Sequence, residues 1–104
     1  MERIAFTMRL KPGCAAEYQR RHDALWPDLA ALLHETGITD YSIFLDEPSL
    51  TLFGVLKRSD RAAFAALPQH PVMRRWWAYM ADLMETNPDQ SPCVSPLREV
   101  FRLE

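Results

Sequence analysis

Glycine, cysteine and long hydrophobic runs are scarce in this sequence. Its three glycines are isolated from one another, so the chain has no glycine-rich loop that could bind a phosphate group. The two cysteines, Cys14 and Cys93, form no CxxC pair, and we expect both to be reduced thiols. No apolar run approaches the roughly 20 residues that a membrane-spanning helix needs, which argues against a membrane protein.

A surplus of charge of one sign is also lacking. The 12 Lys and Arg residues are interspersed with 14 Asp and Glu residues, and the formal net charge is −2. A nucleic-acid site needs a basic face, so we expect no nucleic-acid partner and no attraction to anionic membranes. The first residues, 1–4, lack the apolar segment of a signal peptide, and we expect a cytoplasmic protein.

Residues that commonly bind metals are not clustered. There is no HxxxH pair, no EF-hand loop and no group of Asp, Glu and His residues, so we expect no metal site. His34 lies near an expected helix end, where a structural role is favoured, and His70 precedes Pro71 in an expected turn. His22 therefore remains as the histidine with the strongest case for chemistry.

The pattern of apolar residues predicts the element order β-α-β-β-α-β. Alternation with a period of two predicts four strands, over residues 2–10, 38–46, 50–57 and 97–103. Spacing of three or four residues predicts helices from about residue 15 to a stop near Gly37, over 60–67 and over 71–84.

Pro27 interrupts the first helical stretch. It lacks a backbone N–H and crowds the carbonyl of Asp23, so the helix should kink or restart between Asp23 and Trp26. Pro27 would then open the second segment, because proline is favoured at the first position of a helix.

This element order is typical of an α+β, ferredoxin-like domain that covers residues 1–104. Such a domain is an antiparallel sheet with helices on one face. The other face of the sheet carries apolar residues and has no helix to cover it. We therefore expect a second copy to pack against it, giving a homodimer of the dimeric α/β-barrel type.

Tyr18 and His22 are the first candidates for a functional site. They lie one helical turn apart, just before the expected break, so their side chains share a face. Imidazole can donate or accept a proton near neutral pH, because its unperturbed pKa is about 6.5. The alternative interpretation is that both residues only pack on the half-buried side of the helix.

Adjacent tryptophans, Trp76 and Trp77, are the second candidate. Successive helical residues point about 100° apart, so the two rings cannot fill the same core position. An indole ring can stack on the apolar face of a sugar, and its N–H can bind a hydroxyl. In the alternative interpretation, one ring fills the core and the other covers a loop or a subunit boundary. Tyr41, in the second strand, is open to the same two interpretations.

Two further segments have simpler expectations. The proline-containing stretch 86–96 should be irregular, and it could form a rim or lid of a site. The pairs Arg20-Arg21 and Arg74-Arg75 are expected to lie on the solvated faces of their helices.

The sequence resembles the L-rhamnose mutarotase family nearly from end to end. The similarity is carried by the blocks EYQRRH (17–22), WPDL (26–29), YSIFLD (41–46), RRWWAYM (74–80), NPDQSP (87–92) and EVF (99–101). The resemblance implies a dimeric enzyme that interconverts the α and β anomers of L-rhamnose without a metal or organic cofactor. It implies that His22 is the proton donor and that the sugar is bound by Tyr18, Tyr41, Trp76 and Trp77. Segment 23–25 departs from the Asn-Pro-like turn expected there.

Mutarotation suits these residue types. Opening the hemiacetal requires a proton on the ring oxygen and removal of one from the anomeric hydroxyl, and a positioned acid or base contributes about 10²–10⁴-fold. The base remains open among Tyr18, Tyr41, a carboxylate such as Asp89, and water. A cofactor-free monooxygenase or haem-degrading enzyme on the same fold is the competing enzyme class. A sugar-binding module without catalysis is the non-enzymatic alternative.

Overall fold

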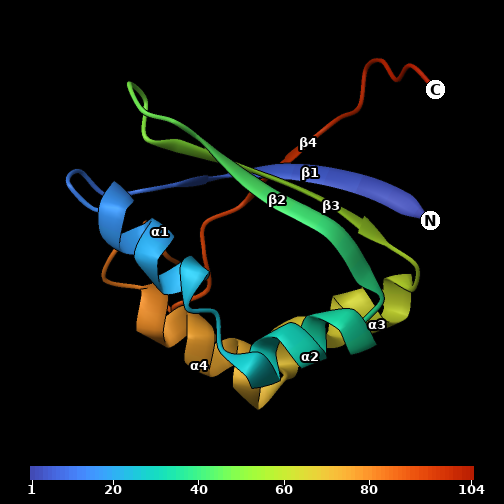
Figure 1. The fold of residues 1–104 in the computed structure, drawn as a ribbon, viewed down its shortest axis with the longest axis horizontal. Coiled ribbons are helices and arrows are strands. Elements are labelled where there is room, and N and C mark those ends of the chain that lie inside the picture. Colours follow the sequence, from blue (N-terminus) through green and yellow to red (C-terminus); the bar gives the residue numbers. More distant parts are fainter.

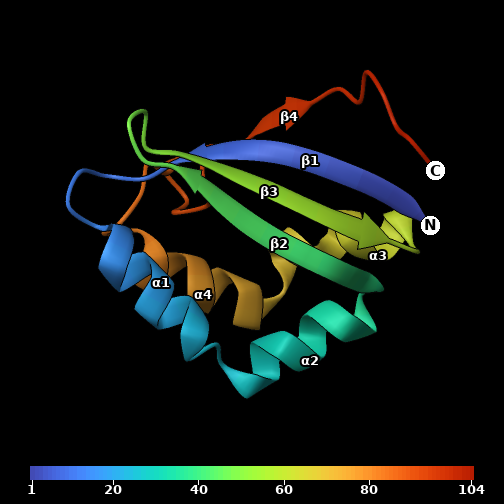
Figure 2. The same ribbon diagram turned by 45° about the horizontal axis from the view of Figure 1, so that its top comes forward.

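A four-stranded antiparallel sheet with helices packed on one face forms the body of the protein (Figure 1). The structure is a computed structural model that describes residues 1–104. Its strands are β1 (Glu2–Arg9), β2 (Ile38–Asp46), β3 (Thr51–Arg58) and β4 (Ser95–Leu97). They lie in the order β2-β3-β1-β4, as Figure 2 shows. The predicted α+β, ferredoxin-like arrangement is confirmed.

The helical layer contains four α-helices. They are α1 (Ala15–Asp23), α2 (Pro27–Glu35), α3 (Arg61–Ala66) and α4 (Pro71–Met80), and the short 3₁₀ turn η1 (Leu67–Gln69) joins the last two. The predicted restart at Pro27 is confirmed, since Pro27 opens α2 and the preceding residue is extended. The carboxylate of Asp60 accepts the N–H of Ala63 at 3.0 Å and thereby caps α3.

Two predicted boundaries are wrong. Helix α4 ends at Met80 instead of residue 84, because the chain then turns back to pair with the end of β1. There the N–H of Lys11 donates to the carbonyl of Leu83 at 2.8 Å, and Met84 forms a bridge with Leu10. A helix could not make these contacts, so the tertiary pairing overrides the helical spacing.

The last strand also differs from the predicted 97–103, because it begins at Ser95, within the stretch 86–96 that was expected to be irregular, and ends at Leu97. Strand β4 pairs only with residues 5–7 of β1, and residues 98–104 form no regular structure. This tail leaves the sheet beyond β4 (Figure 1). The alternation of its apolar residues has no neighbouring strand within the chain to pair with, and an unpaired strand is not stable alone.

The core lies between the sheet and the helices. Its buried members are Met8, Leu10, Tyr18, Leu29, Leu52, Met73, Trp76, Met80, Leu83 and Met84. Within the sheet, Gly54 leaves room for the Phe6 ring over β3, because a Cβ at this position would be 2.5 Å from the ring. Glycine is thus required here by a close approach.

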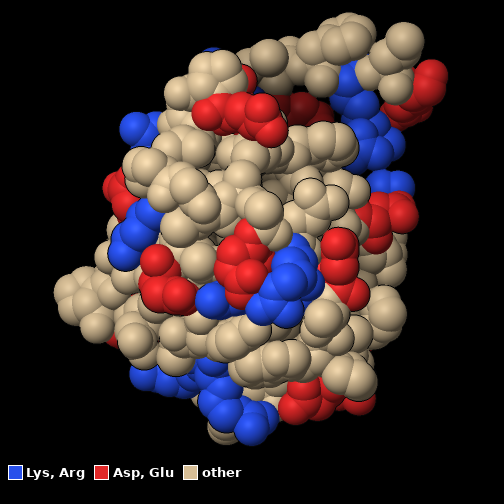
Figure 3. Space-filling model, turned by 60° about the vertical axis from the view of Figure 1, so that its left-hand side comes forward, with Lys and Arg blue, Asp and Glu red and all other residues tan.

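The opposite face of the sheet is uncovered. It presents two paired aromatic rings, Phe44 on β2 and Phe53 on β3, which are 64% and 37% exposed. No helix packs there (Figure 2). On the face shown in Figure 3, Asp and Glu side chains lie beside Lys and Arg side chains, with neither sign gathered in one region. No helix of the structure has the length and apolar character to cross a membrane.

Candidate active site

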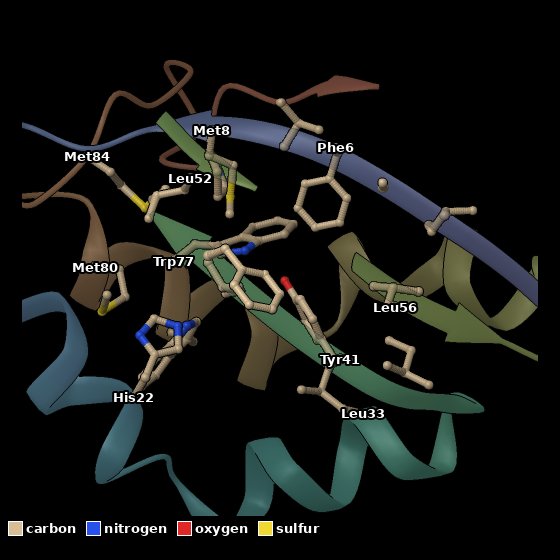
Figure 4. A pocket seen from close by; sticks show the side chains of 18 of the residues that line it. Phe6, Met8, His22, Leu33, Tyr41, Leu52, Leu56, Trp77, Met80 and Met84 are labelled. Atoms are coloured by element: carbon tan, nitrogen blue, oxygen red, sulfur yellow. The ribbon is translucent and has the colours of Figure 1, made fainter. Parts of the chain in front are cut away.

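One large cavity, of about 1860 Å³, begins between the sheet and the helical layer and is open at the edge strands, where its lining continues to exposed residues such as Phe44 and Leu97. Most of its lining residues are hydrophobic, and the aromatic and imidazole rings among them include the four that are labelled in Figure 4. These rings come from four different elements: Phe6 from β1, His22 from α1, Tyr41 from β2 and Trp77 from α4. An apolar cavity with a few converging polar groups is the usual form of a small-molecule site.

His22 stands at the C-terminal end of α1 and is held from two sides. Its ring lies 4.3 Å from the ring of Tyr18, and 5.4 Å from Trp76, which it meets edge-on. Its Nδ1 lies 2.9 Å from the carbonyl oxygen of Tyr18. A carbonyl only accepts, so Nδ1 carries the proton in this hydrogen bond and Nε2 is the nitrogen left for a ligand.

Burial sets the acidity of His22. Loss of hydration lowers the pKa of His22, and it outweighs the hydrogen bond to the Tyr18 carbonyl and the charge of Asp23, which both raise it. The imidazolium form is therefore a stronger acid than an ordinary histidine.

Tyr18 and Tyr41 place two phenol groups at the same cavity. Burial, and then the neighbouring Tyr41, raise the pKa of Tyr18 well above its usual value. Burial raises the pKa of Tyr41 to about 12. Tyr41 is partly exposed as a whole residue, but its hydroxyl is the end that enters the cavity (Figure 4). Both phenols stay protonated at neutral pH, so they can donate hydrogen bonds but are poor bases.

A β-bulge turns Tyr41 toward the cavity. Between Thr39 and Ser42, strand β2 has one residue more than the facing segment of β3, and Asp40 adopts a left-handed conformation with a φ of 49°. Asp tolerates this conformation better than most residues. Bulges commonly redirect a side chain next to an active site. An Asp within a strand was the only sequence signal for this feature.

The two tryptophans have different surroundings. Trp76 is 6% exposed and belongs to the core, where it meets Trp26 edge-on with the ring centres 5.1 Å apart. Trp77 is only half-buried and its ring projects into the cavity (Figure 4). Both line the cavity, so they contribute to it in different ways: Trp77 as a wall, and Trp76 as a support against which His22 rests.

Several polar atoms of these rings have no partner within the protein. No protein hydrogen bond engages the Tyr18 hydroxyl, Nε2 of His22 or the indole N–H groups of Trp76 and Trp77, and none of these atoms is sealed from open space. Polar atoms in an apolar cavity are costly to leave unpaired. The residues that carry these atoms all line the cavity, which favours a hydroxylated ligand.

The stretch 86–96 contributes part of the rim. Ser91 and Pro92 line the cavity, whereas Asp89 does not and instead accepts hydrogen bonds from Ser91. Asn87 fastens the stretch, because its amide donates to the Ser91 hydroxyl at 3.0 Å. The Ser91 contacts lower the pKa of Asp89. Asp89 is therefore engaged in the loop and is a weaker candidate for the base than the sequence suggested.

Two features of the site were missed or misjudged in the sequence. Phe6 was assigned no role in the site from the sequence, but its ring forms the wall of the cavity beside Tyr41, at 6.3 Å between ring centres. Arg21 was expected in solvent, but its side chain is only 11% exposed and pairs with Glu17 and Asp82. The partner at Asp82 lies 61 residues away, so no local pattern could reveal it.

Comparison with known families covers nearly the whole chain. A family model described as L-rhamnose mutarotase matches residues 3–103. The chain belongs to the L-rhamnose mutarotase family. Its activity is L-rhamnose mutarotase activity, the reaction of a carbohydrate isomerase that interconverts anomers.

Individual members of the family are similar over their full length. An L-rhamnose mutarotase of Rhizobium meliloti is 60% identical over 100% of both chains, and one of Brucella anthropi is 59% identical over 98% of this chain and 96% of its own. The crystal structure of an L-rhamnose mutarotase from Formosa agariphila matches with a TM-score of 0.93 and 45% identity, covering 100% of both chains. A protein from Pseudomonas aeruginosa, at 20% identity and a TM-score of 0.60, shares the fold alone, over 95% of this chain and 93% of its own.

Proposed function

We propose that this mutarotase opens and recloses the L-rhamnose ring by proton transfer at Nε2 of His22. The observation that carries the proposal is the hydrogen bond from Nδ1 of His22 to the Tyr18 carbonyl, which commits one nitrogen and leaves the other facing a cavity with unpaired donors. The lowered pKa of His22 makes its imidazolium a stronger acid and leaves the neutral imidazole as the main form at neutral pH, so Nε2 can both give a proton to the ring oxygen and take one back.

In the forward direction the imidazolium gives its proton to the ring oxygen, and the bond between that oxygen and the anomeric carbon breaks. The anomeric hydroxyl loses its proton to a base, so the anomeric carbon becomes an aldehyde and the imidazole becomes neutral. After rotation about the C1–C2 bond, the reverse transfers close the ring from the other face. Water is the base that fits best, because the raised pKa values of Tyr18 and Tyr41 disfavour phenolates.

The four remaining candidates would hold the sugar. The Trp77 ring offers a flat wall on which the ring can stack while the aldehyde remains free to turn. The hydroxyls of Tyr18 and Tyr41 would donate to sugar hydroxyls from two sides, and the indole N–H of Trp76 would add a third donor next to His22.

The protein is further proposed to act as a cytoplasmic homodimer. The uncovered apolar face around Phe44 and Phe53 supports self-association, because exposed apolar faces of sheets are commonly covered by another copy. The cytoplasmic location is supported by two free cysteines, Cys14 and Cys93, which a reducing compartment preserves.

The assignment of His22 is tested by anomer exchange. Saturation transfer between the two H1 signals of L-rhamnose is measured at a pH where spontaneous exchange is slow, with wild-type protein and with a folded His22→Ala variant. We expect transfer with the wild type and a loss of about 10²–10⁴-fold in the variant. Full exchange activity in the variant would remove His22 from the mechanism.

Contact of the sugar with the tryptophans has a separate readout. Indole fluorescence should change when L-rhamnose is added to the wild type, and the change should be mostly lost in Trp77→Leu. An unchanged response in that variant would show that another part of the protein binds the sugar.

A further inference from the structure

Arg21 makes a dense set of contacts between two helices. From α1, its Nε donates to the Glu17 carboxylate at 2.8 Å. Its Nη1 donates to the Asp82 carboxylate at 2.9 Å and to the main-chain carbonyl of Tyr79 at 2.7 Å, and Nη2 donates to the other Asp82 oxygen at 3.3 Å. The guanidinium thus joins α1 to the end of α4.

The end of α4 benefits directly from this cation. Tyr79 belongs to the last turn of α4, where the carbonyl groups have no partner within the helix. Arg21 satisfies one of these carbonyls, and a cation at a helix C-terminus is also favoured by the helix dipole. Two carboxylates then balance the charge of a side chain that is nearly buried.

Helix α1 has few other attachments. Within the helical layer, the main chains of α2 and η1 come close to the main chain of α4. The main chain of α1 comes close to no other helix or strand at more than a few positions, so α1 contacts its neighbours mainly with side chains. The position of α1 therefore depends on a small number of side-chain contacts, among them the buried Tyr18 and the guanidinium of Arg21.

A continuous series of ring contacts leads from Arg21 to His22 by way of α4. The guanidinium carbon lies 4.4 Å from the centre of the Tyr79 ring. That ring is 5.7 Å from Trp76, which in turn meets His22 edge-on at 5.4 Å. Trp26 braces the same rings, at 5.4 Å from Tyr79.

We propose that Arg21 is a positioning residue, which clamps α1 to the end of α4 and so holds the His22 imidazole against Trp76 at the sugar cavity. Arg21 does not line the cavity and acts only through His22, so the inference rests on the proposed role of His22. Small displacements of a catalytic group are costly, because a misplacement of about 1 Å can lower a rate by about 10²-fold.

The test compares Arg21→Met with Arg20→Met. Methionine keeps an unbranched apolar chain and removes every donor. Arg20 is the control, because it also pairs with Glu17 on α1 but is 63% exposed, does not reach Asp82, and approaches α4 only at the side chain of Tyr79. For each variant, kcat and KM of anomer exchange are measured by NMR, and the pKa of His22 is measured from its imidazole signals, at temperatures where circular dichroism shows a folded protein.

We expect kcat to fall at least tenfold in Arg21→Met, with KM changed less, and the pKa of His22 to rise toward the ordinary value as the loosened helix admits water. Arg20→Met should stay within twofold of the wild type in both constants. Arg21→Lys should retain more of the wild-type kcat than Arg21→Met, because an ammonium group can replace one of the contacts of the guanidinium but not all of them. Asp23, the charged neighbour that raises the pKa of His22, is unchanged throughout.

A folded Arg21→Met with the kcat and the His22 pKa of the wild type would overturn the proposal. If Arg21→Met does not fold, Asp82→Asn serves instead, because it removes one exposed partner and should shift both readouts in the same direction by a smaller amount. Unchanged readouts there would likewise overturn it. The same experiments separate this proposal from the assignment of His22 as the proton donor. If that assignment is wrong, His22→Ala keeps its activity. The pKa of His22 in Arg21→Met still reports whether Arg21 holds α1 in place.

Discussion

The two faces of the sheet carry similar apolar side chains, but only the inner face has helices above it. On the inner face, Phe6 and Met8 pack against the helical layer, and unpaired polar atoms of rings converge on the cavity between them. On the outer face, Phe44 and Phe53 are exposed and no helix encloses them. The comparison indicates that the helices convert an apolar sheet face into a reaction site, whereas the bare face suits association.

The same strand serves both faces. Because of the bulge in β2, Tyr41 sends its hydroxyl into the cavity while Phe44, three residues later, lies on the outer face. The predictions below alter one face at a time, beginning with the change of largest expected effect.

The largest effect is expected from a charge on the outer face. Phe53→Asp would place a carboxylate in each half of a symmetric interface, and burying an unpaired charge costs several kcal/mol. We expect the proposed dimer to dissociate at least about 100-fold more readily in this variant, as measured by sedimentation. Gln69→Asp is the control, because it adds the same charge on the helical side. Equal association of both variants and the wild type would contradict the assignment of this face.

Next in size is an added methyl on the inner face. Gly54→Ala would bring a Cβ to within 2.6 Å of two carbon atoms of the Phe6 ring, and overpacking of this kind costs about 1–3 kcal/mol. The free energy of unfolding should fall by that amount in chemical denaturation. In a Phe6→Leu background the same change should cost clearly less, because the clashing ring is gone. An equal loss of unfolding free energy with Phe6 and with Leu at position 6 would contradict the close approach of the Phe6 ring to Gly54.

A smaller effect is expected from the Tyr41 hydroxyl. Tyr41→Phe removes one donor to the sugar, worth about 1 kcal/mol, so kcat/KM for anomer exchange should fall about fivefold. Ser42→Ala, on the same strand but facing out and away from the cavity, should leave kcat/KM unchanged. If the two variants behaved alike, the hydroxyl would have no part in sugar binding.

The smallest effect concerns the pH dependence of stability. Because burial lowers the folded-state pKa of His22, the unfolded chain binds more protons just below pH 6.5, and stability should rise with pH up to about that value. Glu2 and Glu17, held in the folded protein at a pKa of about 2 by Arg61 and Arg20, add to the rise only toward pH 5, where their carboxyls in the unfolded chain begin to bind protons. Denaturation between pH 5 and 7 should show this rise in the wild type and a flatter profile in His22→Gln; equal profiles would contradict it.

Local signals in the sequence predicted much of the fold. The break at Pro27 and the start of a helix at about residue 60 were found because both depend on neighbouring residues alone. The end of α4 at Met80 and the shortness of β4 were missed, because each depends on a partner strand or its absence.

In the candidate site, too, the features that depend on neighbouring residues were predicted and those that depend on distant residues were missed. The one-turn spacing of Tyr18 and His22 correctly predicted neighbouring rings. The sequence could not show which of the adjacent residues Trp76 and Trp77 is buried. The burial depends on which rings of α1 and of the connection 24–26 pack against α4. The buried position of Arg21 depends on Asp82, which is brought near it only by folding.

The most direct test of the account is chemical rescue of His22→Ala. Anomer exchange of L-rhamnose is followed by saturation transfer in the folded variant while imidazole is added, with a Ser42→Ala protein as the control. We expect exchange near the spontaneous rate without imidazole and a saturable rise with it, because the truncated side chain leaves space for a free acid beside Trp76. Exchange at the wild-type rate in the variant without imidazole would contradict the central claim that His22 transfers the proton.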